Sequence, residues 1–192
     1  MNKKRRLYTP SNNIERVAIS GLFLTLALAL PPLFHVFGAG SVFLPMLLPI
    51  VTAGFLLDSK SAITIGIIAP LLSALMTGMP PFMPPIAFMM SMELAILALL
   101  PSILYRRFGI GLYVVLILTL VLNRFLVLAL RFVVAEIFNI PGMVYGMAVA
   151  ISGFPGLLIQ IIIVPMVVRT IEHRYGSYPA ISGGTVSDEE KL

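Results

Sequence analysis

Six long apolar runs, separated by short polar or proline-rich connections, occupy most of this chain. The runs lie at about residues 17–37, 42–57, 61–77, 85–104, 110–133 and 143–168. A helix needs about 20 apolar residues to cross a bilayer, with a range of roughly 17–25. Lipid offers the backbone no hydrogen-bond partner, so each run is expected to be helical, and none shows the period-two alternation of a membrane β-barrel. The sequence therefore predicts an all-α integral membrane protein, a bundle of six transmembrane helices.

The composition supports this prediction. Of the 192 residues, 59% are hydrophobic and only 11% are charged, whereas soluble domains average about 25% charged residues. The net charge of +5 could suggest nucleic acid as a partner of a soluble protein, but here the basic residues flank the apolar runs. We therefore expect no nucleic-acid partner. The absence of cysteine excludes disulfides, thiolate metal sites and cysteine nucleophiles.

The second and third runs are the weakest part of this count because both are short. Only four residues, Asp58 to Ser61, separate their apolar parts. We interpret the pair as a tight helical hairpin in which Asp58 or Ser59 caps the following helix. The alternative is a re-entrant or buried pair, which would leave four true spans.

The distribution of basic residues predicts an orientation. Lys3, Lys4, Arg5, Arg6 and Arg16 precede the first run, while the connections at 38–41, 78–84 and 134–142 contain no Lys or Arg. The positive-inside rule then places both termini in the cytoplasm. The domain prediction is a basic cytoplasmic N-terminus at 1–16, a membrane domain at 17–172 and a disordered cytoplasmic tail at 173–192.

Polar side chains within apolar spans are costly and usually functional. They are His35, Glu93, Asn123, Arg124, Arg131, Glu136 and Gln160. With both termini in the cytoplasm, Glu93 and Arg124 fall in the outer half of the bilayer, and Arg131 lies on the same helix face as Arg124. One hypothesis is a ligand site that is open to the outside. The other is a Glu93–Arg124 ion pair that only fixes helix packing.

Methionine and proline are concentrated between the third and fourth runs, from Leu75 to Pro85, with Met79 and Met83 among them. Proline stiffens a non-helical connection, and methionine gives an adaptable apolar surface. We interpret this segment as a lid over a flat, partly apolar small molecule. A copper(I) relay and simple gap filling between helices are the alternatives.

Gly21, Thr25 and Ala29 form a stripe of small residues on the first helix, because a spacing of four keeps them on one face. Such a stripe lets another helix approach closely, either within the bundle or on a partner. There is no phosphate-binding glycine loop and no Walker lysine. We therefore expect a chain that is not an enzyme, holds no metal or cofactor and does not hydrolyse ATP itself.

Five segments of the sequence form a set: the first helix running into Leu30–Gly38, the segment Phe43-Leu44-Pro45-Met46 followed by Ala53–Leu56, the stretch from Pro70 to Pro81, Met92-Glu93-Leu94, and Leu104–Arg107. Together they resemble the substrate-binding S components of energy-coupling factor (ECF) vitamin transporters. The resemblance covers roughly residues 15–172. It implies a six-helix subunit in the cytoplasmic membrane of a prokaryotic cell, partnered by a transmembrane coupling subunit and two ATP-binding subunits.

The resemblance also implies site residues and a class of solute. S components capture a vitamin or related micronutrient near the outer surface, with the connections after the first, third and fifth helices contributing to the pocket. Carried onto this chain, the predicted substrate-binding residues are His35, Phe43, Met79, Met83, Glu93, Asn123, Arg124 and Arg131. Many members dock onto the coupling subunit through an Ala-xxx-Ala pattern on the first helix, whose nearest match here is Gly21, Thr25 and Ala29.

The substrate itself does not follow from the resemblance. Arg124 and Arg131 favour an anionic or acceptor-rich group, and the Phe and Met residues favour a ring system. The expected function is high-affinity solute capture for an ATP-driven importer. The alternatives are a stand-alone secondary carrier or channel, coupled to protons through Glu93, and a membrane scaffold without a ligand.

Overall fold

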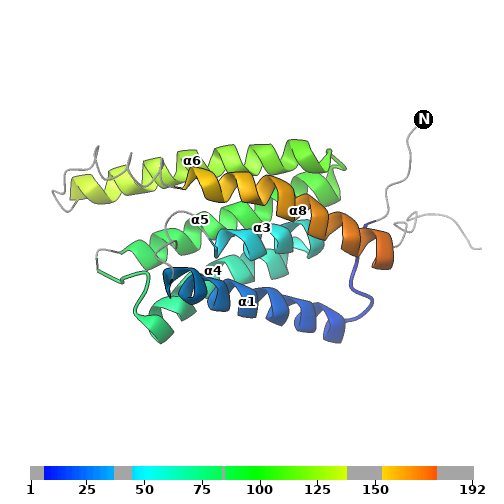
Figure 1. Cartoon of the computed structure of the whole chain (residues 1–192), viewed down its shortest axis with the longest axis horizontal. Coiled ribbons are helices and arrows are strands. Elements are labelled where there is room, and N and C mark those ends of the chain that lie inside the picture. The colour runs from blue at the N-terminus through cyan, green and yellow to red at the C-terminus, as the bar shows by residue number, and fades with distance from the viewer. Residues whose placement is uncertain (1–6, 37–44, 84, 138–152, 177–192) are drawn as a thin grey trace, which may run out of the picture.

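The structure is a computed structural model that describes residues 7–36, 45–83, 85–137 and 153–176, with the side chains of His35, Val36 and Ala135 excluded. Its helices are α1 (Asn13–Val36), α3 (Leu47–Leu56), α4 (Ser59–Thr77), α5 (Ile86–Pro101), the π-helical turn η1 (Ser102–Arg107), α6 (Leu112–Ile137) and α8 (Phe154–Tyr175). The helices lie side by side along the long axis of the molecule (Figure 1). The predicted all-α bundle is confirmed, with six α-helices in the described part of the chain.

Five of these helical segments are long and apolar enough to cross a membrane. They are Asn13–Phe34, Ser59–Thr77, Ile86–Arg107, Leu112–Val134 and Phe154–Tyr175. The protein is therefore a multi-pass membrane protein. α1 begins and α8 ends at the same end of the bundle (Figure 1). We call this the basic end, because it carries Arg16, Arg106 and Arg174, and we call the opposite end, with the turn from Gly78 to Met83, the far end.

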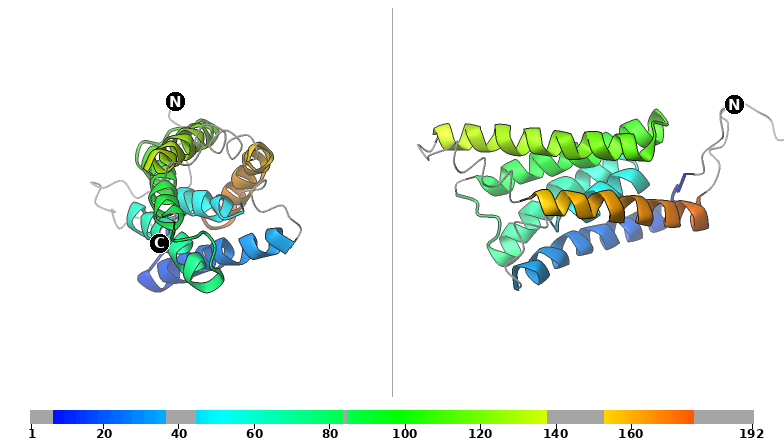
Figure 2. Two further views of the ribbon diagram at one scale, coloured as in Figure 1. Left: turned by 90° about the vertical axis from the view of Figure 1, so that its left-hand side faces the viewer. Right: turned by 45° about the horizontal axis from the view of Figure 1, so that its top comes forward.

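The second apolar run, predicted to cross the membrane at 42–57, corresponds to the short helix α3, which corrects that expectation. Ten residues span about 15 Å, half of a hydrocarbon core of about 30 Å. All of its residues except Leu48 are buried, and it packs against α1, α4, α5 and α8 near the middle of the bundle (Figure 2). The hydrophobicity of this run thus reflects burial within the protein, while α4 alone has the length of a span.

Two glycines allow the central helices to approach closely. A Cβ atom on Gly66 of α4 would lie 2.7 Å from the carbonyl oxygen of Leu94 on α5. A Cβ atom on Gly54 of α3 would collide with the carbonyl oxygen of Ala98, also on α5. Both neighbours are backbone atoms, which cannot move aside as a side chain can. The backbones of α3 and α4 therefore rest directly on α5.

Of the two predicted capping residues, Asp58 and Ser59, it is Asp58 that caps α4. Its Oδ2 accepts a hydrogen bond from Ser61 N at 3.3 Å and its Oδ1 one from Ser61 Oγ at 2.9 Å, while Arg16 Nε of α1 lies 3.5 Å from Oδ1. Burial by itself would raise the pKa of Asp58. The hydrogen bonds from Ser61 and the charge of Arg16 outweigh that effect and hold the pKa below its usual value.

Asp58→Ala is expected to lower the free energy of unfolding by about 1 kcal/mol near pH 7, since that is the usual value of an N-cap. A lowered carboxyl pKa adds stability above the unfolded pKa of about 3.9, and this contribution is lost as the pH falls through the folded pKa. The difference between wild type and Asp58→Ala should therefore be constant at neutral pH and shrink below about pH 4. Unfolding in mixed detergent micelles across this pH range measures it, and a difference that grows in acid would contradict the assignment.

Two helices extend beyond the apolar runs from which the sequence predicts them. α1 begins at Asn13, inside the predicted polar N-terminus, because Asn12 Oδ1 accepts a hydrogen bond from Glu15 N at 2.8 Å and so caps the helix. α8 continues to Tyr175, beyond its last apolar residues. Tyr105 Oη donates a 2.7 Å hydrogen bond to Glu172 Oε2, which fixes this last turn. The rest of the predicted tail, 177–192, lies outside the described residues.

Candidate functional site

A polar cluster lies in the membrane domain where α5 faces α6. Asn123 of α6 is 2% exposed, and its Nδ2 donates a 2.6 Å hydrogen bond to Oε1 of Glu93 on α5. The other amide atom, Asn123 Oδ1, is buried and accepts no hydrogen bond from the described residues. Since polar groups buried in protein are nearly always paired, this oxygen offers an acceptor for a bound molecule.

Two arginines of α6 lie close enough to Glu93 to interact with it electrostatically. Arg124 follows Asn123 directly, Arg131 lies seven residues further along α6, and both interact electrostatically with Glu93. Nε and Nη2 of Arg124 are buried. The sequence left open a simple Glu93–Arg124 ion pair. The structure adds Asn123 as the hydrogen-bond partner of Glu93 and Arg131 as a second electrostatic neighbour, so the candidate cluster consists of Glu93, Asn123, Arg124 and Arg131.

The cluster is biased towards the far end of the bundle. Glu93 is the eighth residue of α5, so it lies about 10 Å along the helix axis from the far-end start of α5. Arg131 lies about 10 Å nearer to the far end than Arg124 along α6. Arg131 is therefore the cluster residue of α6 that lies nearest to the far end.

Gln160 of α8 is a second buried amide that the sequence listed as intramembrane but placed in no role. It is fully buried, and neither of its amide atoms has a hydrogen-bond partner among the described residues. Leaving a buried polar group unpaired costs about 1–3 kcal/mol. The sequence could have indicated that Gln160 is buried, because helical spacing puts it on one face with the small or apolar residues Gly156, Leu157 and Val164. The structure shows that all of them are buried.

The other predicted substrate-binding residues lie apart from this cluster or outside the description. His35 is in the last turn of α1 without a described side chain, and Phe43 lies outside the described residues. Met79 and Met83 are 60% and 77% exposed in the turn that joins α4 to α5. Ser73 Oγ fixes the start of this turn by donating a 2.8 Å hydrogen bond to Met79 O. The lid role of this turn stays a prediction.

The small-residue stripe of α1 faces away from the bundle. Gly21, Thr25 and Ala29 are all exposed, and a Cβ atom on Gly21 would meet nothing within 4 Å. Thr25 Oγ1 donates its hydrogen to Gly21 O at 2.8 Å, so its hydroxyl is satisfied within the helix. Of the two possibilities left open by the sequence, packing within the bundle is therefore excluded for the described part of the chain.

No cluster of His, Cys, Asp and Glu suited to a metal ion occurs among the residues that the structure describes. Comparison of the chain with protein-family models, with curated proteins and with solved structures finds no match. The geometry of the cluster and the outward stripe are therefore the basis for a functional proposal.

Proposed function

We propose that this protein is the substrate-capture subunit of an ATP-driven importer of the ECF type, and that it binds a vitamin-like solute at the cluster of Glu93, Asn123, Arg124 and Arg131. The observation that carries the proposal is the composition of this cluster. Two arginines, one carboxylate and an amide with a spare acceptor meet inside a membrane bundle. Intramembrane ionisable groups are retained mainly where they serve a function.

The cluster favours a solute with an anionic or acceptor-rich portion. Arginine presents a planar fork of donors that matches carboxylate and phosphate. Two guanidinium groups accompany the single carboxyl group of Glu93 in this cluster, so an anionic group on the solute would meet a favourable electrostatic environment. Asn123 Nδ2 is engaged by Glu93, so the free Oδ1 would select a donor group on the solute.

A coupling partner is supported by the outward stripe of Gly21, Thr25 and Ala29. Small residues on an exposed membrane helix let a second helix approach closely, and the exposed stripe lacks such a neighbour among the described residues. The sequence holds no nucleotide-binding motif, so ATP hydrolysis belongs to separate subunits in this proposal.

Reconstitution into liposomes tests the proposal against a stand-alone carrier, for which the intramembrane Glu93 is the favourable observation. The expected result is that the chain alone binds a solute from a panel of vitamins but does not accumulate it under a proton gradient. Accumulation is expected only with a coupling subunit, two ATP-binding subunits and ATP. Uptake by the chain alone, abolished by Glu93→Gln, would refute the proposal in favour of proton-coupled transport.

A further inference from the structure

Two buried amide side chains on neighbouring helices have hydrogen-bonding atoms without a partner. Gln160 of α8 is fully buried, and Asn123 of α6 is 2% exposed. Among the described residues, Oε1 and Nε2 of Gln160 and Oδ1 of Asn123 form no hydrogen bond. Thr119, one turn before Asn123 on α6, is buried as well, but its Oγ1 donates a 2.8 Å hydrogen bond to Val115 O of its own helix. The two amides therefore require an explanation that the buried hydroxyl does not.

The contact of Arg169 with Tyr113 shows that the two amides lie at about the same depth. α6 and α8 pack against each other and run in opposite directions along the bundle (Figure 1). Arg169 Cζ of α8 lies 5.0 Å from the centroid of the Tyr113 ring of α6. From this contact Asn123 lies about 15 Å towards the far end along α6, and Gln160 lies about 14 Å in the same direction along α8. Both side chains are buried, so they enter the bundle at one level.

The short helix α3 begins at this level too. Gly54 of α3 is in close contact with Ala98 of α5, and both helices run towards the basic end (Figure 1). Leu47, the first residue of α3, lies about 11 Å from this contact, and Glu93 of α5 lies about 8 Å from it in the same direction. Glu93 in turn accepts the hydrogen bond from the amide of α6. The first turn of α3 and three polar side chains, from α5, α6 and α8, thus share one depth in the bundle.

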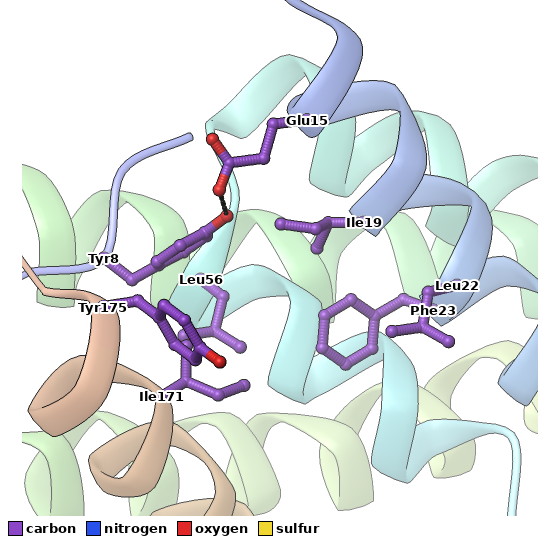
Figure 3. A pocket seen from close by; sticks show the side chains of 8 residues that line it. All are labelled: Tyr8, Glu15, Ile19, Leu22, Phe23, Leu56, Ile171 and Tyr175. Atoms are coloured by element: carbon purple, nitrogen blue, oxygen red, sulfur yellow. Dashed lines mark hydrogen bonds between the residues drawn. The ribbon is translucent and has the colours of Figure 1, made fainter. Parts of the chain in front are cut away.

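A cavity at the basic end has a different character. It has a volume of about 210 Å³, and side chains of α1 and α8 line it on either side of Leu56 (Figure 3). Its carboxylate, Glu15, accepts hydrogen bonds from Tyr8 Oη at 2.7 Å and from Ser11 N at 2.6 Å. The rest of its wall is almost entirely apolar. Unpaired buried amides, which suit a polar ring, are found at the level of Gln160 and not in the wall of this cavity.

The chemistry of a carboxamide indicates which group would satisfy Gln160. Its Oε1 accepts and its Nε2 donates, and the two atoms lie side by side. The N–H and C=O of a lactam, cyclic urea or cyclic imide also lie side by side, so such a ring can form two parallel hydrogen bonds with a carboxamide. Glutamine pairs in the same bidentate way with the donor and acceptor of adenine. We call this N–H beside a C=O in a ring an amide-type edge.

We propose that Gln160 is a specificity-determining residue of the solute site, where it binds an amide-type edge on the ring of the solute. The inference rests on the proposed function and adds the part of the solute that the arginines do not select. Arg124 and Arg131 would hold the anionic or acceptor-rich portion, while Gln160 would hold the ring. A solute without the edge would leave the buried carboxamide unpaired, so the site should reject it.

Isothermal titration of the purified full chain in mild detergent tests this inference with defined probes. Biotin, folate and riboflavin carry an amide-type edge, whereas nicotinate and pyridoxine do not. Each of the first three is compared with a counterpart that is methylated on the ring nitrogen and so lacks the donor of the edge. We expect wild type to bind at least one of the three, and to bind its methylated counterpart at least about tenfold more weakly.

Gln160→Met is the informative variant, because it keeps the length of the side chain and removes its amide. It should bind the probe and the methylated counterpart with similar affinity. The melting temperature of the variant without solute should rise by about 2–4 °C, since no unpaired amide is buried. Gln160→Leu is a second variant with the same expected results. Thr119→Val, the matched control, removes a buried hydroxyl that is already satisfied and should keep the preference for the unmethylated probe.

The possible failures of this inference and of the proposed function can be told apart. Equal affinity of wild type for a probe and its methylated counterpart, or an undiminished preference in Gln160→Met, would overturn the role of Gln160 while solute capture stands. Binding only of vitamins without an amide-type edge would do the same. If no probe and no other vitamin binds, the proposed function is wrong, and the role of Gln160 falls with it.

Discussion

Replacing Gly66 by valine is expected to abolish or strongly reduce the folded fraction of the protein in mild detergent. The new Cβ would lie 2.7 Å from Leu94 O and 2.8 Å from the backbone of Ala95, so α4 would have to move away from α5. Overpacking of this kind costs about 1–3 kcal/mol, and more where the neighbour is rigid. Because α4 and α5 form the most extensive helix pair among the described elements, separating them would disrupt the packing of most of the bundle.

Gly21→Val is the matched control for this experiment. It makes the same substitution in another membrane helix, so the change in helix propensity is similar, but nothing lies within 4 Å of the new Cβ atom. We expect its melting temperature, measured by circular dichroism or by loss of the monodisperse peak on heating, to stay close to wild type. Equal destabilisation by Gly66→Val and Gly21→Val would show that the close contact of α4 with α5 is not the cause.

Arg124→Leu is expected to weaken solute binding by about 10- to 100-fold, the usual value of a hydrogen bond to a charged group. The fold should survive, because Arg131 still balances the charge of Glu93. Arg124→Lys should recover only part of the affinity, since an ammonium keeps the charge but not the planar fork of donors. Isothermal titration with the solute identified from the vitamin panel measures both effects.

Arg107→Leu provides the same change at the basic end, where Arg107 is exposed and outside the cluster. It should leave the affinity unchanged. If Arg124→Leu lowers only the melting temperature and leaves the affinity intact, the cluster is a packing device and the protein is better described as a scaffold.

The sequence predicts the six α-helices of the described residues because lipid imposes one simple rule, that apolar runs become helices. It also predicts the cap at Asp58, which depends on local chemistry within four residues. It fails for α3, because an apolar run buried by protein and one that faces lipid look alike in composition. Only the packing of α1, α4, α5 and α8 around Leu47–Leu56 distinguishes the two.

In the candidate site, too, the positions of residues along each helix could be predicted from the sequence, whereas the contacts between helices could not. Helical periodicity brings Glu93, Arg124 and Arg131 to one half of the bilayer, but the direct partner of Glu93 is Asn123, which depends on the rotation of two helices. The sequence likewise includes Arg106 only in the segment Leu104–Arg107 and assigns it no contact. Its hydrogen bonds to Tyr8 O and Leu56 O join segments about 50 to 100 positions apart in the chain, which no local pattern could indicate.

Native mass spectrometry of the protein purified from its own membrane in mild detergent tests the central claim most directly. The account predicts one bound small molecule per chain, with an anionic or acceptor-rich portion, whose mass is present with wild type and Arg107→Leu and absent with Arg124→Leu. A chain that carries no small molecule, and whose melting temperature no member of the vitamin panel raises, would contradict it.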